Sequence, residues 1–424
     1  MEKLKPTSEQ LDFLNWEFGI FFHFGIRSFY PGRVDWDGIE MPAQGFNPDN
    51  LDCEQWLKAV KDAGATYAIL TVKHHDGFAL WPSAYSNYGV ANSPWKNGKG
   101  DVVREFVDAC RKYKVKVGLY YSPAQWGSHA IPFESEKEYD DYFVNQITEL
   151  LSNYGKIDYL WFDGCGSEGH VYDRDRIMGT ILALQPHILT FYDPDWGATV
   201  RWVGNEDGYA SLSNPLNVCE WDFSERTEKS IALSKLFCMP TECDCKLRRT
   251  WFFDNNEDTI KPLSELFGMY EGSVGRGSNF LLNVGPDHHG RICDADLTRL
   301  LELGEKIRKV YSTPLPFGAL EQDGNAYSIT HPDFFKEKPD PTVGLTNRIV
   351  LCEDMTEGQA VRAFKVYAHL PFYKKKRILV YTGETIGHKL ICQIPAIRTP
   401  KITVEITDSD GTAILSSINA YFAD

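Results

Sequence analysis

The sequence has no long apolar run and no excess of positive charge. Charged or polar residues interrupt every hydrophobic stretch well before membrane-spanning length, so no membrane partner is expected. Asp and Glu number 59 against 44 Lys and Arg, giving a formal net charge of −15. A nucleic-acid partner is therefore not expected either, because phosphate binding requires clustered Lys and Arg. The one dense basic run, YKKKRILV, leads into a strand-like segment and is interpreted as a solvated edge.

Cysteine patterns typical of zinc sites or disulfide scaffolds are also absent. The ten cysteines are scattered, and the closest two, Cys243 and Cys245, have the spacing C-x-C. Others, such as Cys110 and Cys392, lie within apolar periodicity, where a reduced thiol behaves as a small hydrophobic group. The N-terminal segment lacks the apolar core of a signal peptide. We therefore expect a reducing compartment and a cytoplasmic location for the chain as given.

Apolar residues, in contrast, are abundant enough for two cores. The chain has 424 residues, of which 43% are hydrophobic and 13% aromatic. This length exceeds the size at which single hydrophobic cores usually stop growing, so we expect two domains.

The N-terminal part, to about residue 310, alternates short apolar runs with helix-like segments. The runs are FGIFFHFG, TYAILTVKHH, VKVGLYYS, IDYLWFDG, ILTFYD, KLFCMPTEC and SNFLLNVGP. Apolar strands linked by helices indicate a parallel sheet. Nearly every run ends in polar residues, and in a (β/α)8 barrel the active site lies at the carboxyl ends of the strands. Residues 1–312 are therefore predicted to form a (β/α)8-like (TIM) barrel.

The C-terminal part has a different pattern. From about residue 315 it contains short alternating runs separated by Gly, Pro and Asp, such as NRIVLCED, VRAFKVYA and ITVEITDS. This pattern is typical of an antiparallel β-sandwich, which we predict for residues 313–424. The segment STPLPFG, with two prolines, is the expected linker.

A carboxylate, Asp163, ends the apolar run IDYLWFDG. A side chain at the end of a buried strand is held rigidly, which suits a nucleophile or a proton carrier. The alternative is that Asp163 caps a following helix, since Asp is a favoured N-cap residue.

Two adjacent histidines, His74 and His75, follow another apolar run. Side chains of neighbouring strand residues point to opposite faces, which favours one buried and one solvated ring. Asp76 and Gly77 come next, so the chain turns there and both rings can face the barrel mouth.

The histidines allow two kinds of site. Together with His23 and Asp163 they resemble the ligand set of a barrel metallohydrolase, but such enzymes usually use H-x-H on one strand. Sugar hydroxyls instead require several neutral donors and acceptors beside an aromatic wall. The sequence supplies these in His23, His74, Trp81, Tyr121, Trp202 and Trp251. We expect no metal and no other cofactor.

Six segments follow one another over nearly the whole N-terminal part: WEFGIFFHFG, TVKHHDGFALWPS, GLYYSP, YLWFDG, RWVGNEDGYA and NFLLNVGPDHHGRI. In this order they resemble the α-L-fucosidases of glycoside hydrolase family 29. The resemblance implies a somewhat irregular barrel followed by a β-sandwich, and a fucosylated oligosaccharide or glycoconjugate as substrate. It also implies a retaining mechanism, in which an Asp attacks the anomeric carbon and a Glu acts first as acid and then as base.

Carried over onto this sequence, the resemblance assigns the nucleophile to Asp163. It assigns an arginine near the nucleophile to Arg201, which would keep Asp163 ionised. Asp76 is then expected to orient the neighbouring histidines. The predicted substrate-binding residues are His23, His74, His75, Trp81, Tyr121, Arg201, Trp202, Glu242 and Trp251.

Two glutamates compete for the acid/base role, Glu206 in GNEDGYA and Glu242 in PTECDC. Glu206 is preferred because its segment resembles that of the family's subgroup acting on α-1,3/1,4-linked fucose. A loop over the pocket would also partly desolvate the carboxyl, as a general acid requires. Where many relatives have Glu-Trp after the first strand, this chain has Asp35-Trp36, with Glu40 as a nearby replacement. A non-catalytic fucose-binding protein is the main alternative function, followed by a metal-dependent barrel hydrolase.

Overall fold

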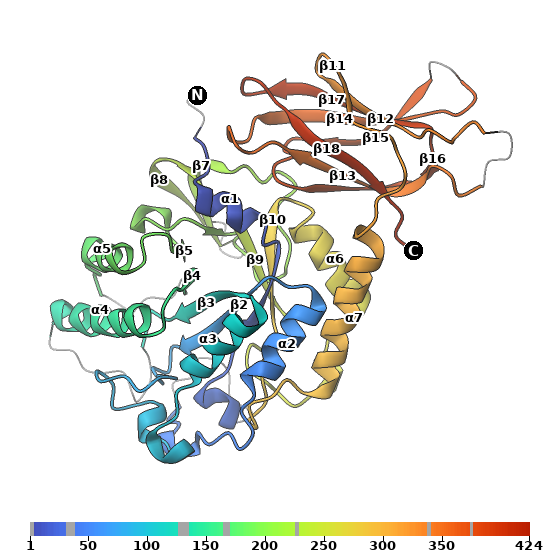
Figure 1. The fold of residues 1–424 in the computed structure, drawn as a ribbon. Coiled ribbons are helices and arrows are strands. Elements are labelled where there is room, and N and C mark those ends of the chain that lie inside the picture. The colour runs from blue at the N-terminus through green and yellow to red at the C-terminus, as the bar shows by residue number, and fades with distance from the viewer. Residues whose placement is uncertain are drawn as a thin grey trace.

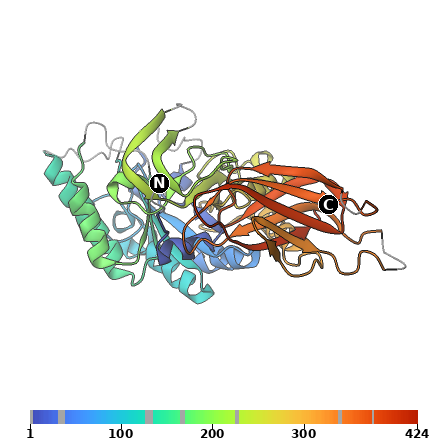
Figure 2. The same ribbon diagram turned by 90° about the horizontal axis from the view of Figure 1, so that it is seen from above.

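The computed structural model describes residues 4–30, 39–125, 135–163, 170–224, 229–336, 341–373 and 376–424. It has two parts, a barrel surrounded by helices and a β-sandwich, which lie side by side in both views (Figures 1 and 2). No helix in the described ranges combines the length and the apolar character needed to cross a lipid bilayer.

The first part is built on an eight-stranded sheet in which every neighbouring pair is parallel. The strand order is β5-β4-β3-β2-β1-β10-β9-β6. A parallel bridge between Phe191 and Val200 joins the two edges, so the sheet is a nearly closed barrel. The predicted (β/α)8-like barrel is confirmed, with a two-residue β6 as its main irregularity. The strands are β1 (Phe18–Phe22), β2 (Tyr67–Lys73), β3 (Lys116–Tyr121), β4 (Tyr159–Phe162), β5 (Leu189–Phe191), β6 (Arg201–Trp202), β9 (Thr241–Lys246) and β10 (Ser278–Asn283).

Helices cover the outside of the barrel (Figure 1). They are α2 (Cys53–Ala63), α3 (Val102–Tyr113), α4 (Glu136–Asn153), α5 (Arg174–Leu184), α6 (Leu263–Ser273) and α7 (Asp294–Tyr311). Side chains of Asp52, Asp101, Ser135 and Asp173 accept a backbone hydrogen bond in the first turn of α2 to α5. Gly64, with φ of 85°, ends α2 in the left-handed conformation that glycine favours. The helix α1 (Ser8–Leu14) places Phe13 inside the barrel.

The two largest apolar clusters of the described barrel part lie on opposite faces of the sheet because strand side chains alternate. One lies between the sheet and the helices and includes Trp81 and Tyr121. The other fills the barrel interior and includes Tyr67, Tyr120 and Trp161. Only every second residue of a strand points into the barrel, so a shift of one position decides whether a side chain can reach the mouth.

The second part is the predicted antiparallel β-sandwich. A five-stranded sheet of order β11-β12-β17-β14-β15 packs against a three-stranded sheet of order β16-β13-β18, with one apolar core. The predicted boundary after residue 312 falls between α7 and β11. The strands are β11 (Glu321–Asp323), β12 (Ala326–Thr330), β13 (Leu345–Glu353), β14 (Val361–His369), β15 (Arg377–Gly383), β16 (Leu390–Arg398), β17 (Lys401–Ser409) and β18 (Leu415–Tyr421).

One further antiparallel pair, β7 (Asn217–Ser224) and β8 (Lys229–Cys238), lies between β6 and β9 in the sequence. The predicted apolar run KLFCMPTEC is therefore divided, since β8 ends at Cys238 and β9 begins at Thr241. Pro240 separates the two strands, and proline lacks the backbone donor that a continuous strand would need.

Candidate active site

The carboxyl ends of the first four barrel strands carry the candidate catalytic and binding side chains. His23 follows β1, His74 and His75 follow β2, Ser122 follows β3, and Asp163 follows β4. The three histidines are buried, and the side chain of Asp163 remains 26% exposed. In a barrel these ends meet at one mouth, so the predicted convergence of His23, His74, His75 and Asp163 occurs.

Asp163 is held by its neighbours at the mouth. Its Oδ2 accepts a hydrogen bond of 2.8 Å from the Tyr120 hydroxyl and lies 3.6 Å from His75 Nε2. The Tyr120 hydroxyl thus holds one carboxylate oxygen of Asp163 in place. The partial exposure of the side chain keeps the carboxylate accessible to a ligand.

Neighbouring polar side chains orient two of the histidines. The Nδ1 of His23 lies 2.7 Å from Asn283 Oδ1, while Asn283 Nδ2 donates to the carbonyl of Trp251 at 2.7 Å. The amide oxygen of Asn283 is thereby directed at His23, so Nδ1 carries the proton and Nε2 is left as an acceptor. His75 Nδ1 lies 2.6 Å from Ser122 Oγ.

Asp76, which was expected to orient the histidines, accepts a hydrogen bond of 2.8 Å from the backbone N–H of Phe78. This contact shapes the turn after β2. Burial raises the pKa of Asp76 to about 6. The hydrogen bonds that the structure shows at the histidines instead involve Asn283 and Ser122.

The buried histidines are neutral near pH 7. Burial lowers the pKa of His23 to about 3 and the pKa of His74 well below its usual range. Burial also lowers the pKa of His75, against the opposing charge of Asp163. Among the described residues, the buried Nδ1 of His74 has no hydrogen-bond partner. Neutral imidazoles can donate and accept hydrogen bonds, as sugar hydroxyls require.

Aromatic rings enclose the histidines. His23 stacks on Trp251 at a centroid distance of 4.8 Å and an angle of 29°. His74 lies parallel to Tyr120 at 5.6 Å and 14°. Phe252 contacts His23 and His74 edge-on at 5.5 and 5.2 Å. The predicted aromatic wall therefore includes Trp251, and Tyr120 and Phe252 are members that the sequence analysis missed.

Asp244 and Lys246 are two residues apart on β9, so their polar groups point to the same side of the sheet. Trp202 Nε1 donates to Asp244 Oδ1 at 2.6 Å. Lys246 Nζ lies 2.6 Å from Glu206 Oε2 and 4.4 Å from the centre of the Trp251 ring. Glu206, 31% exposed, is thus connected through Lys246 to the wall beside His23. Burial, followed by the charge of Glu206, raises the pKa of Asp244 well above its usual range.

Glu242 lies elsewhere. It was expected at the end of a strand, but it is the second residue of β9 and fully buried inside the barrel. Its partners Tyr67 and Tyr159 are the first residues of β2 and β4. Glu242 therefore lies at the amino ends of the strands, opposite to the mouth.

Two predicted pocket residues, Tyr121 and Trp81, face the helices. The Tyr121 hydroxyl donates to Gln146 Oε1 at 2.8 Å, and Trp81 Nε1 donates to Glu149 Oε2 at 2.9 Å, both on α4. Both rings are buried in the outer cluster. Tyr120 occupies the inward position instead, which the alternation of strand side chains would have indicated.

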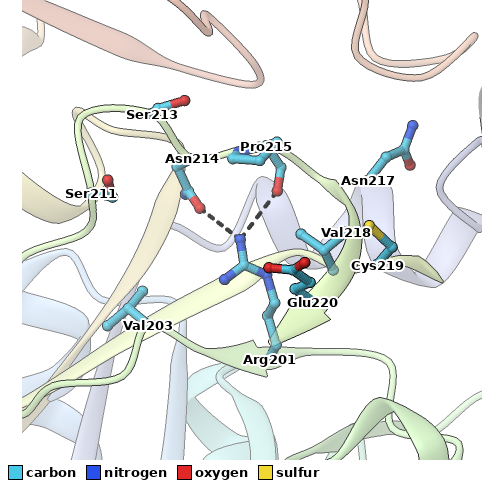
Figure 3. A pocket seen from close by; sticks show the side chains of 10 residues that line it. All are labelled: Arg201, Val203, Ser211, Ser213, Asn214, Pro215, Asn217, Val218, Cys219 and Glu220. Carbon is cyan, nitrogen blue, oxygen red and sulfur yellow. Dashed lines mark hydrogen bonds between the residues drawn. The ribbon is translucent and has the colours of Figure 1, made fainter. Parts of the chain in front are cut away.

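Arg201 was expected beside the nucleophile but points out of the barrel. Its Nη2 donates to Asn214 Oδ1 at 3.0 Å and to the carbonyl of Pro215 at 3.1 Å (Figure 3). These residues line a cavity of about 320 Å³ beside Glu220 on β7. The neighbouring Trp202 packs against the barrel interior, so alternation directs Arg201 to the other side.

The predicted pair Asp35-Trp36 lies outside the described residues, and Glu40 is exposed. In the described part of the chain, no group of three or more His, Cys, Asp or Glu side chains is arranged to hold a metal ion.

The fold and site define a barrel protein with carboxylates, neutral imidazoles and aromatic rings at the carboxyl ends of its strands, which suits an uncharged sugar. The chain belongs to the α-L-fucosidase family, glycoside hydrolase family 29, whose "Alpha-L-fucosidase" model matches residues 2–310. Alpha-L-fucosidase 1 of Arabidopsis thaliana is 36% identical over 324 residues, covering 73% of this chain. This chain spans 62% of the length of that relative. The putative alpha-L-fucosidase 1 of rice is 30% identical over 449 residues, covering 98% of this chain and 84% of the relative.

Solved structures agree with this assignment. A putative alpha-L-fucosidase from Bacteroides ovatus has a TM-score of 0.86 and 36% identity, covering 99% of this chain and 74% of that one. A putative alpha-L-fucosidase from Bacteroides thetaiotaomicron has a TM-score of 0.87 and 30% identity, covering 99% and 98% of the two chains.

Proposed function

We propose that the chain is a retaining α-L-fucosidase that removes terminal fucose from branched α-1,3/1,4-fucosylated glycans. The observation that carries the proposal is the placement of Asp163, whose carboxylate is fixed by Tyr120 and partly exposed next to neutral histidines. Family membership supplies the reaction class, and the segment that carries Glu206 supplies the proposed linkage.

In the first step, a carboxylate oxygen of Asp163 attacks the anomeric carbon, and the bond to the leaving oxygen breaks as Glu206 protonates that oxygen. In the second step, Glu206 takes a proton from water, which attacks the anomeric carbon and releases Asp163. His23, His74 and His75 bind the fucose hydroxyls, and Trp251 and Phe252 contact its apolar face.

Glu206 acts as an acid in the first step and as a base in the second, and Lys246 is its ion-pair partner. Lys246 Nζ lies 2.6 Å from Glu206 Oε2, and the second step uses Glu206 as a carboxylate. The first step needs a protonated Glu206, so we propose that substrate entry separates it from Lys246.

The nucleophile is tested by replacing Asp163 with Asn and measuring hydrolysis of an aryl α-L-fucoside. Turnover should fall by roughly a thousandfold or more, because no glycosyl-enzyme can form. Tight fucose binding by the unmodified protein without release of the aryl group would favour the non-catalytic alternative. Lost activity after chelation, restored by zinc, would favour the metal-dependent alternative.

The acid/base assignment is tested by Glu206→Ala. The first step on an oligosaccharide should slow far more than that on an aryl fucoside, since only the poor leaving group needs protonation. Azide should restore turnover of the aryl substrate by attacking the glycosyl-enzyme without base help. A panel of α-1,2, α-1,3, α-1,4 and α-1,6 fucosides tests the linkage, and preference for α-1,2 or α-1,6 would contradict the proposal.

A further inference from the structure

A buried carboxylate, Glu242, lies inside the barrel and has no part in the two steps above. Both of its oxygens accept hydrogen bonds. The Tyr67 hydroxyl donates to Oε2 at 2.6 Å, while the Tyr159 hydroxyl and Trp161 Nε1 donate to Oε1 at 3.1 and 2.8 Å. Three donors from two strands therefore converge on one side chain from a third strand.

The direction of these bonds is defined by chemistry. An indole N–H can only donate, so Trp161 needs an acceptor at this point. Burial and the charge of Glu242 raise the pKa values of Tyr67 and Tyr159 well above their usual range, so both hydroxyls keep their protons. Burial also raises the pKa of Glu242 itself, to about 7.

Trp161 connects this carboxylate to the mouth. It is two residues before Asp163 and therefore faces the same side of β4. Its indole stacks on Phe191 at 4.1 Å and 9°, and on Tyr120 at 5.3 Å and 24°. Tyr120 in turn donates to Asp163 and lies parallel to His74. The orientation of the indole thus determines the surface that supports both the nucleophile's donor and a sugar-facing histidine.

We propose that Glu242 is a positioning residue for the reaction: it fixes the indole plane of Trp161, which in turn supports Tyr120 against Asp163. This inference rests on the proposed function only because its test measures turnover of a fucoside. Glu242 itself does not contact the sugar, because it lies at the opposite ends of the strands.

Four variants test the proposal: Glu242→Gln, Glu242→Leu, Trp161→Phe and the double variant Glu242→Leu/Trp161→Phe. Glutamine keeps an acceptor for Trp161 and can donate to a tyrosine hydroxyl, so it should retain kcat within roughly threefold. Leucine frees the indole and should lower kcat by roughly 10- to 100-fold on an aryl fucoside, since small misplacements near a nucleophile have effects of this size. The double variant should be no slower than the slower single variant, because both changes remove the same contact.

Tyr67→Phe is the matched control. It removes another hydrogen bond to Glu242 while leaving Trp161 bonded, so kcat should change by less than roughly threefold even if the protein is less stable. Equal loss of kcat in Tyr67→Phe and Glu242→Leu would mean that the cluster only stabilises the fold, and would overturn the proposal.

Other outcomes also decide the question. If Glu242→Gln is as inactive as Asp163→Asn and azide restores it, Glu242 is the acid/base. If the losses of the two single variants multiply in the double variant, Glu242 does not act through Trp161. If Glu242→Leu does not fold, Glu242→Gln and Trp161→Phe still test the two ends of the contact, and a Trp161→Phe variant with unchanged kcat overturns the proposal. If the unmodified protein turns over no fucoside, the proposed function fails separately, and fucose affinity measured on the same variants then tests the positioning of the pocket.

Discussion

Two adjacent tyrosines at the end of β3 have different roles because strand side chains alternate. Tyr120 donates to the proposed nucleophile, Asp163, and Tyr121 donates to Gln146 on α4. Tyr120→Phe should lower kcat on an aryl fucoside by roughly 10-fold or more, since a hydrogen bond to a charged group is lost at the reacting carboxylate. Tyr121→Phe should leave kcat unchanged and lower the free energy of unfolding by about 1 kcal/mol. Equal kcat losses in the two variants would contradict this assignment.

The buried histidines make stability depend on pH. The pKa of His23 is about 3 in the folded protein against an ordinary value of 6.5. Above pH 6.5 both the folded and unfolded forms are neutral. As the pH falls toward 3, only the unfolded chain gains this proton, so His23 alone should lower the free energy of unfolding by about 1.4 kcal/mol per pH unit.

Urea unfolding between pH 7 and pH 4 measures this dependence. His23→Gln should make the decline shallower, because one group of this kind is removed. His289→Gln is the control, since His289 is exposed and its hydrogen bond to Asp49 raises its pKa. A decline as steep in His23→Gln as in the unmodified protein would show that His23 is protonated in the folded state.

Residue types at the mouth could be predicted from the sequence, whereas side-chain directions could not. Asp163 and the three histidines follow apolar runs, and this signal was sufficient to bring them together. Arg201 was assigned by the family resemblance alone and Tyr121 by its place at the end of an apolar run, and each lies one residue from the inward position. Tyr120 on β3 and Trp161 on β4 are register partners, so both side chains point into the barrel. Asp163 lies two residues after Trp161 and therefore points to the same side.

At the scale of elements, one close contact at the amino ends of the barrel strands links β1 to Glu242 and the side chains that donate to it. A Cβ on Gly19 would lie 2.3 Å from the Tyr67 ring, whose hydroxyl donates to Glu242. Gly19→Ala should therefore lower the free energy of unfolding by about 1 to 3 kcal/mol, because the ring must move within a packed core. Gly179→Ala in α5 is the matched control, with nothing within 4 Å of its added Cβ. It should stabilise the protein by about 0.5 to 1 kcal/mol, as measured by urea unfolding.

Element types followed from periodicity, but one boundary did not. The run KLFCMPTEC was predicted as one strand, and its division at Pro240 moved Glu242 from the end of a strand to its start. The β7–β8 pair also had no periodic signal strong enough to separate it from the barrel strands. Local pattern defines a strand, whereas the sheet that it joins depends on contacts distant in sequence.

At the scale of the whole molecule, a buried carboxylate joins the barrel to the sandwich. Glu271 on α6 accepts hydrogen bonds from Arg348 Nε at 2.6 Å and Nη2 at 3.1 Å, on β13. Gln393 on β16 donates to it at 3.0 Å, and the Tyr311 hydroxyl on α7 also donates to it. The backbone adds a hydrogen bond of 2.9 Å from Ile391 to the carbonyl of Gly275. Polar contacts from both parts thus meet at one side chain, which is 4% exposed.

Removing that carboxylate should destabilise both parts together. Glu271→Ala leaves the Arg348 guanidinium largely buried without its partner, which should cost about 3 to 5 kcal/mol. Thermal unfolding should be a single transition at a lower Tm, because other contacts between the barrel and the sandwich remain, such as the hydrogen bond from Ile391 to Gly275. Lys58→Met, which breaks the exposed pair with Asp62 on α2, is the control and should cost less than about 1 kcal/mol. If Glu271→Ala instead splits unfolding into two transitions with the barrel Tm unchanged, the sandwich does not stabilise the barrel. Because α6 leads directly into β10, whose Asn283 orients His23, a loosened junction should also raise KM for the fucoside.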